Sequence, residues 1–182
     1  MAQEGTDLIP APSSGDHVRG SLDAPVVISE FGDFECPYCG EAFGVLEAIR
    51  EQYGQRVALV FRHYPLPMHP HAIDAAEAAE AAASVGKFWE MHDELFRHQA
   101  ALRISDLRAY AAAIGVDGDG LVAAINDETY AERIVRDQGS GDQSGIEATP
   151  ALFINGFAYE DEVSVAALAE VIDRALATVR TG

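Results

Sequence analysis

Cysteine, lysine and long apolar runs are scarce in this sequence. Its 182 residues include two cysteines and a single lysine, Lys87, and no run of about 18 apolar residues that would span a membrane as a helix. Thirty Asp and Glu against twelve Lys and Arg leave a net charge of -18. Nucleic acid and anionic membrane surfaces are therefore not expected as partners, because their phosphate groups would be repelled.

The N-terminal segment also lacks recognisable signals. Residues 1–7 contain neither the positive n-region nor the apolar h-region of a secretory signal. The expected compartment is the cytoplasm, or a periplasmic or extracytoplasmic one if a leader has been trimmed. With 48% hydrophobic residues, the chain is long enough to form one domain with a substantial core, or one domain with a sizeable insertion.

The two cysteines stand together in the segment Cys36-Pro37-Tyr38-Cys39, where an apolar strand gives way to a helix. A thiol at a helix start faces unpaired backbone N–H groups and the positive end of the helix dipole, which favours the thiolate. In Cys-X-X-Cys motifs the first cysteine titrates at roughly 3.5–7.5 instead of about 8.5. We therefore predict a redox centre in which Cys36 is the nucleophile and Cys39 is buried and resolves the mixed disulfide.

Two other interpretations of the cysteine pair are open. A Cys-X-X-Cys pair can be half of a zinc site, but there is no second pair of this kind, and only His92 and His98 approach the usual spacing of histidine ligands. His69 and His71 stand without a cluster of acids or cysteines. A purely structural disulfide is the second alternative. Redox chemistry, with no bound metal and no cofactor, is the prediction that we favour.

The apolar pattern around the pair predicts a strand, a helix and a second strand. Residues 1–20 are expected to form a loose lead-in. Val26–Phe31 and Val57–Phe61 are apolar nearly throughout, as buried parallel strands are. The helix between them starts at Pro37, which suits a first turn because its missing N–H costs nothing there, and it ends at Gly54.

An acid inside the first strand is unusual. Glu30 lies six residues before Cys36, and we expect it beneath the disulfide, where it accepts and returns the proton of Cys39. Burial raises the pKa of a carboxyl group toward neutrality, which suits such a transfer. The alternative is a strand-end residue that reaches solvent. For His63, at the end of the second strand, we predict an ordinary hydrogen-bonded role.

The remainder of the chain divides into a helical block and a return to strands. Helical periodicity is found at 72–83, 88–96, 107–113, 121–125 and 130–135, and residues 66–140 contain no predicted strand. An Asn155-Gly156 turn then joins the predicted strands Ala151–Ile154 and Phe157–Tyr159 into an antiparallel hairpin. Ser164 caps a last amphipathic helix.

This order of elements, with Cys-Pro-Tyr-Cys near its start and Thr149-Pro150 before the hairpin, resembles the DsbA-like branch of the thioredoxin fold. The likeness covers residues 21 to about 180 and includes the phrases Phe61–Leu66, Gly86–His92 and Ala148–Gly156. It implies an α/β, thioredoxin-like fold, a central mixed β-sheet flanked by helices. Residues 21–65 and 141–182 would form that domain, with residues 66–140 as an inserted all-helical subdomain.

The resemblance also implies roles for individual residues. Pro150 would be a cis-proline that faces the disulfide, Thr149 would offer its backbone to an extended substrate polypeptide, and Glu30 matches the family's buried acid. The implied activity is thiol–disulfide exchange with protein thiols. The implied partners are protein or peptide thiols and disulfides and a redox partner, either a thioredoxin/glutathione system or a membrane oxidase.

The middle of the motif departs from the best-known members, which have a histidine between the cysteines. Tyr38 cannot donate that positive charge to the thiolate, so we expect a less oxidising couple than the about -120 mV of DsbA. Cys-Pro-Tyr-Cys is also the glutaredoxin signature, which raises glutathione-linked reduction as an alternative, although glutaredoxins lack so long a helical insertion. Two further alternatives are a non-catalytic peptide-binding or chaperone module and a zinc-dependent dimer joined through Cys36 and Cys39.

Overall fold

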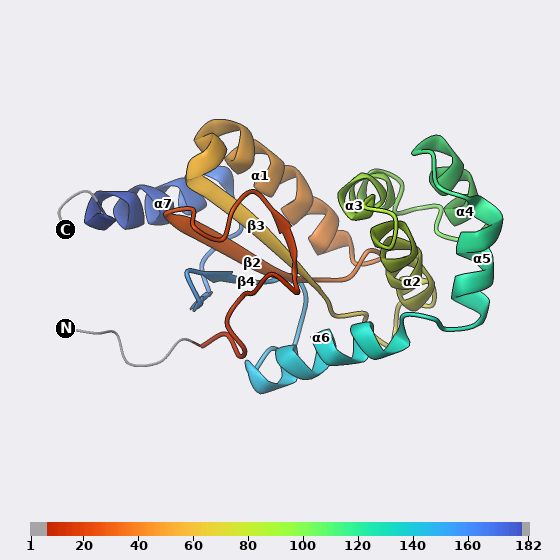
Figure 1. Ribbon diagram of the computed structural model, residues 1–182. Helices are drawn as coiled ribbons and strands as arrows, with labels where there is room; N and C mark the ends of the chain where they lie inside the picture. The colour runs from red at the N-terminus through yellow and green to blue at the C-terminus, as the bar shows by residue number, and fades with distance from the viewer. Residues whose placement is uncertain (1–6, 180–182) are drawn as a thin grey trace.

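The computed structural model describes residues 7–179. Within this range five strands form one sheet in the order β1-β3-β2-β4-β5, surrounded by helices α1 to α7 (Figure 1). The strands are β1 (His17–Arg19), β2 (Val26–Gly32), β3 (Val57–His63), β4 (Ala151–Ile154) and β5 (Phe157–Tyr159). The helices are α1 (Pro37–Tyr53), α2 (Ala72–Ala83), α3 (Phe88–Arg97), α4 (Ile104–Ala113), α5 (Gly118–Asn126), α6 (Ala131–Gln143) and α7 (Val165–Val179), with a 3-10 turn at Gly54–Arg56.

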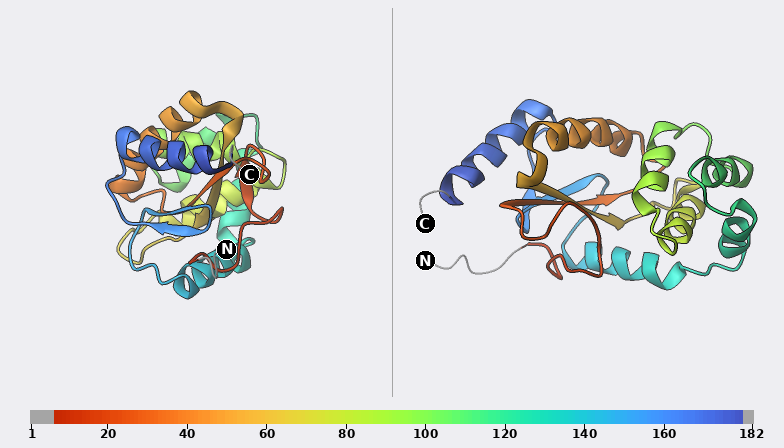
Figure 2. Two further views of the ribbon diagram at one scale, coloured as in Figure 1. Left: turned by 90° about the vertical axis from the view of Figure 1, so that its left-hand side faces the viewer. Right: turned by 45° about the horizontal axis from the view of Figure 1, so that its top comes forward.

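The parallel strands β2 and β3 form the centre of the sheet. Helices α1 and α7 cover one face of the sheet, and α6 lies against the other face (Figures 1 and 2). Because both faces are covered, the strands are apolar nearly throughout, as the sequence predicted. The core between the sheet and the two helices includes the fully buried side chains of Ile28, Ile49 and Leu168.

A second core lies at the end of the sheet, where α2 to α5 form the helical part of the molecule (Figure 1). Helix α2 is rich in alanine, and its short side chains let α3 and α5 pack closely against it. Phe34, Cys36 and Cys39 belong to this second core. The cysteine pair is therefore packed between the sheet and the helical part.

The hairpin and the last helix follow the sequence prediction. Asn155 and Gly156 both have positive φ, 51° and 86°, which is the conformation of a two-residue hairpin turn. Strand β4 pairs antiparallel with β2, so that Glu30 lies opposite Leu152. The hydroxyl of Ser164 accepts a hydrogen bond from the backbone N–H of Ala167 (3.3 Å), which caps α7.

The lead-in differs from the expected loose segment. His17–Arg19 forms β1, which pairs antiparallel with β3, and Leu8 is buried. A strand of three residues is too short to show a period, and it forms only because β3 offers a free edge. The segment is also held by Arg62, a buried side chain whose guanidinium donates to both carboxylate oxygens of Asp16 (2.8 and 3.1 Å).

Other boundaries also shift. Strand β3 continues through Arg62 and His63 instead of ending before them, because both side chains find buried partners. Helix α4 starts at Ile104, one turn before the predicted start at Leu107. The expected boundary between residues 140 and 141 falls inside α6, which packs against β3 as well as α2. Helix α6 thus joins the helical part to the sheet.

Arg62→Ala is expected to lower the free energy of unfolding by about 3–5 kcal/mol, because the carboxylate of Asp16 stays buried without its counter-charge. Chemical denaturation followed by circular dichroism measures the change. The control Arg174→Ala removes an exposed guanidinium from α7 and should change the free energy by less than about 0.5 kcal/mol. Equal effects of the two substitutions would contradict the structural role of Arg62.

Candidate active site

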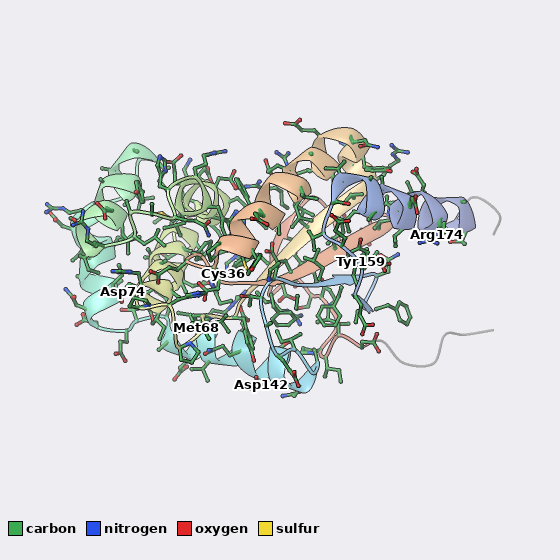
Figure 3. All side chains as sticks on the ribbon, turned by 180° about the vertical axis from the view of Figure 1, so that it is seen from behind. Cys36, Met68, Asp74, Asp142, Tyr159 and Arg174 are labelled. Atoms are coloured by element: carbon green, nitrogen blue, oxygen red, sulfur yellow. The ribbon has the colours of Figure 1, made fainter. Side chains whose placement is uncertain are left out.

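Cys36 is the residue that immediately precedes the first turn of α1. Its backbone is extended, Pro37 occupies the first helical position, and the first-turn N–H groups have no partners within the helix. Cys36 is only 3% exposed, and its thiol donates a weak hydrogen bond to the carbonyl oxygen of Thr149 (3.5 Å). Figure 3 shows Cys36 at the start of the helix, where the sheet meets the helical part.

The surroundings of Cys36 favour the thiolate. A hydrogen bond from the thiol of Cys39 lowers the pKa of Cys36 to about 5. Burial opposes this effect, whereas the side chain of Thr149 and the backbone N–H groups of Cys39 and Tyr38 add to it. This pKa lies within the range found for Cys-X-X-Cys cysteines at helix N-termini. At neutral pH the sulfur of Cys36 is therefore ionised.

Cys39 has the opposite environment. It is fully buried one helical turn after Cys36, and both thiols are free. The hydrogen bond to Cys36, burial and the nearby charge of Glu30 together raise the pKa of Cys39 well above its ordinary value. The backbone N–H of Asp33 donates to the sulfur of Cys39 (3.5 Å). At neutral pH the pair consists of one thiolate and one thiol.

Glu30 is buried in the middle of β2, 5% exposed, and does not reach solvent at a strand end. Burial, together with the charge of Cys36, raises the pKa of Glu30 to about 8. Its Oε1 atom has no hydrogen-bond partner. A cavity of about 10 Å³ that Glu30 lines together with Phe43, Phe61, Trp89 and His92 approaches the smallest volume that one water molecule occupies.

The segment before β4 closes the site from the other side. The peptide bond between Thr149 and Pro150 is cis, and the carbonyl of Thr149 faces the sulfur of Cys36. The side chain of Thr149 is buried beside this sulfur and helps to lower the pKa of Cys36. The residues that the sequence singled out on two distant segments, Cys36 and Cys39 on α1 and Thr149 and Pro150 before β4, therefore come together.

An open groove lies beside this contact. Its volume is about 360 Å³, and it is lined by Tyr38, Glu41, Ala42, Thr149, Pro150, Glu162 and Val163. The side chain of Tyr38 is 68% exposed and does not belong to the hydrophobic core. The groove therefore joins the first turn of α1 to the segment that carries the cis-proline.

Asp33 is a site residue that the sequence analysis missed. Its buried carboxylate accepts hydrogen bonds from the backbone N–H groups of Glu35 and Leu66 (both 2.8 Å) and contacts Nδ1 of His69 (2.6 Å). Burial disfavours the charged form of His69, but Asp33, Cys36 and Glu35 outweigh this effect and raise its pKa. An Asp side chain that accepts a hydrogen bond from the backbone N–H two residues later forms a common type of turn. The position of Asp33 directly after an apolar strand is the sequence signal for such a turn.

Two further contacts hold the loop before α1. The carboxylate of Glu35 binds Nδ1 and the backbone N–H of His71 (2.8 and 2.6 Å). The side-chain amide of Gln99, which follows α3, donates to the carbonyl oxygens of Phe34 and Cys36 (both 2.8 Å). Nothing in the sequence around Gln99 marks this role, because it depends on the packing of the helical part against the loop.

His63 has the hydrogen-bonded role that the sequence predicted. Its Nε2 and that of His17 both contact Oε1 of Glu80 (2.7 and 2.6 Å). Within residues 7–179, His17, His63 and Glu80 form the group whose potential ligand atoms lie close enough together, within 4.8 Å of one another, to hold a metal ion. Neither cysteine belongs to this group. His69 and His71 instead pair with Asp33 and Glu35, one histidine to each carboxylate.

Comparison with known proteins places this site in a family. A family model described as thioredoxin matches residues 13–174. The Na(+)/H(+) antiporter NhaA 1 of Mycolicibacterium vanbaalenii is 41% identical over 91% of this chain. The match covers 27% of that protein, so the chain spans about a quarter of the length of this relative. None of the helices within residues 7–179 has the length and apolar character needed to cross a membrane.

Two solved structures have the same fold. BdbD from Bacillus subtilis, in its oxidised form, superposes with a TM-score of 0.82 and 24% identity, covering 89% of this chain and 93% of that one. The alpha-DsbA1 protein of Wolbachia pipientis gives a TM-score of 0.81 and 21% identity, with 96% and 100% covered. These matches confirm the expected fold class, the mixed sheet with an inserted helical part. The chain belongs to the thioredoxin family and has the DsbA-like form of its fold.

Proposed function

We propose that the chain is a thiol–disulfide oxidoreductase that exchanges disulfides with protein thiols through Cys36 and Cys39. The observation that carries the proposal is the asymmetry of the pair: Cys36 has a pKa of about 5 at the helix start, whereas the pKa of its buried neighbour is raised. Such asymmetry distinguishes an attacking sulfur from a resolving one. A structural disulfide would not require it.

In the first step of reduction, the Cys36 thiolate attacks one sulfur of a substrate disulfide. A bond forms between Cys36 and that sulfur, the substrate disulfide breaks, and the other substrate sulfur leaves as a thiolate that takes a proton from solvent. Ionisation of Cys36 also removes the hydrogen bond that its thiol donates to the carbonyl of Thr149. That carbonyl then has a free acceptor position for a backbone N–H of an extended substrate.

In the second step, Cys39 attacks the sulfur of Cys36, and the second substrate sulfur leaves. Two electrons pass from the pair to the substrate, and a Cys36–Cys39 disulfide remains. Cys39 must first lose its proton, and Glu30 is the buried acceptor beside it. Burial and the negative charge of Cys36 keep Glu30 protonated at neutral pH while the pair is reduced. The mixed disulfide removes that charge and lowers the pKa of Glu30, so its carboxyl releases its own proton to solvent and can then accept the proton of Cys39.

The same steps in reverse oxidise a substrate dithiol, and the direction depends on the redox partner, for which a thioredoxin/glutathione system and a membrane oxidase are the candidates. The match with an antiporter extends over about a quarter of that protein. We therefore assign thiol–disulfide exchange to this segment alone, and not ion transport.

The rate at which iodoacetamide alkylates Cys36 is expected to rise with pH through a midpoint near 5, because only the thiolate reacts. Mass spectrometry of samples quenched at a series of pH values measures the midpoint. In the control Cys36→Ser the remaining cysteine is buried and protonated, so it should not react at neutral pH. A midpoint near that of a free thiol, about 8.5, would instead favour a peptide-holding module without redox chemistry.

Cys36→Ser is expected to abolish reduction of insulin, because no nucleophile remains, whereas Cys39→Ser should accumulate mixed disulfides with substrate proteins that dithiothreitol releases. Turbidity measures insulin reduction, and non-reducing gels detect the trapped species. If either variant retained full activity, the assignment of the two roles would be wrong.

The reduction potential of the pair is expected to lie between about -270 mV and about -120 mV, the values of thioredoxin and DsbA. The reason is that the pKa of Cys36, about 5, lies between the roughly 7 and roughly 3.5 of those proteins, and a more stable thiolate makes the disulfide more oxidising. Equilibration with glutathione buffers, followed by Trp89 fluorescence or alkylation, measures the potential. A value as positive as that of DsbA would contradict the influence assigned to Tyr38.

A further inference from the structure

The groove beside Pro150 has walls of one charge. Three segments form or border it: residues 35–44, 145–151 and 159–165. They carry six acidic residues and no lysine or arginine. The acidic residues are Glu35, Glu41, Glu147, Glu160, Asp161 and Glu162. The guanidinium of Arg97 lies over the ring of Phe43, 6.0 Å from its centroid, but it pairs with Asp93 and Glu94 of its own helix and does not line the groove.

Most of these carboxylates have no counter-charge. Glu35 pairs with His71 (2.8 Å), but within residues 7–179 none of the other five forms an ion pair. All five are exposed, and Glu41 and Glu162 line the groove itself. Two carboxylates without an ion pair therefore line a groove whose wall includes Thr149, the residue that contacts the sulfur of Cys36.

The redox chemistry does not explain these charges. A carboxylate near Cys36 disfavours its thiolate, since like charges repel, and so works against the attack that the site performs. A substrate that carries positive charge would reverse the effect, because it would be attracted to the groove and would shield the thiolate. Electrostatic attraction of this kind raises association rates by about 10-fold to 1000-fold at low ionic strength.

Two neutral groups in the same groove fit a cationic peptide as well. The exposed ring of Tyr38 offers a face on which an arginine guanidinium can stack, an arrangement that favours Arg over Lys. The carbonyl of Thr149 becomes an acceptor for a peptide N–H once Cys36 is ionised. Charge, a stacking surface and a backbone acceptor thus surround the position that a substrate cysteine occupies.

We propose that this groove selects polypeptide substrates in which arginine or lysine flanks the reactive cysteine. The selection rests on the proposed thiol–disulfide exchange and specifies its substrate class. Glu41 and Glu162 bind the cationic side chains, and Tyr38 stacks against arginine. The remaining carboxylates at the rim attract the substrate over a longer range, up to about 8 Å at physiological ionic strength.

The test uses three peptide disulfides that differ only in the residues flanking the cysteine, which are Arg, Gln or Glu. The second-order rate constant for their reduction by the reduced protein is measured at low and high salt. The Arg peptide should react at least about 10-fold faster than the Glu peptide at low ionic strength, and the ratio should approach one at about 1 M salt. The Gln peptide reports thiol–disulfide exchange without charge selection.

Two double variants with the same change in net charge locate the effect. Glu41→Gln/Glu162→Gln should lose most of the ratio between the Arg and Glu peptides. The control Glu51→Gln/Asp127→Asn removes two exposed carboxylates at the far end of α1 and at the end of α5, and it should keep that ratio. Equal ratios in both double variants would show that net charge and not the groove discriminates, which would overturn the proposal.

The outcomes also separate the two proposals. If the wild-type protein reduces all three peptides at the same rate, the charge selection is wrong while thiol–disulfide exchange stands. If it reduces none of them, the exchange activity itself is wrong. Faster reduction of the Glu peptide than of the Arg peptide would likewise contradict the selection proposed here.

Discussion

The hydrogen bond between the two sulfurs of the pair is the interaction on which the rest of the site depends. It is the largest of the causes that lower the pKa of Cys36 and raise that of Cys39, so the same contact favours an attacking thiolate and a protonated resolving thiol. Cys36 immediately precedes α1 and Cys39 lies in its first turn, where side chains tilt toward the helix N-terminus and therefore toward Cys36. The local geometry of one helix start thus determines the chemistry.

The neighbouring segments hold that helix start in place from several directions. Asp33 binds the backbone at Leu66 and contacts His69, Glu35 binds His71, and Gln99 binds two carbonyl groups of the loop. Gln99 belongs to the helical part, which therefore supports the active-site loop as well as enclosing it. The inserted helical part thus helps to fix the active-site loop in a position that contacts with the sheet alone would not hold.

Much of this arrangement can be predicted from the sequence because the relevant signals are local. Cys36-Pro37-Tyr38-Cys39 between an apolar strand and a helix, the unusual acid Glu30, and Asn155-Gly156 each identify their structure within a few residues. The features that were missed depend on distant partners. Strand β1 exists because of the edge of β3, Arg62 is buried because Asp16 meets it, and Gln99 reaches the loop only after two cores have packed together.

The unpartnered carboxyl of Glu30 has a consequence for how the protein stores protons. Between about pH 5 and pH 8 the reduced pair holds one proton, on Cys39, and Glu30 holds another because burial, together with the charge of Cys36, raises the pKa of its carboxyl. Forming the disulfide removes that charge, so oxidation releases the thiol proton together with part of the carboxyl proton. Two electrons are then accompanied by between one and two protons, and the midpoint voltage falls by about 30 to 60 mV for each unit of alkalinity. The disulfide is therefore a stronger oxidant in acidic surroundings than in alkaline ones.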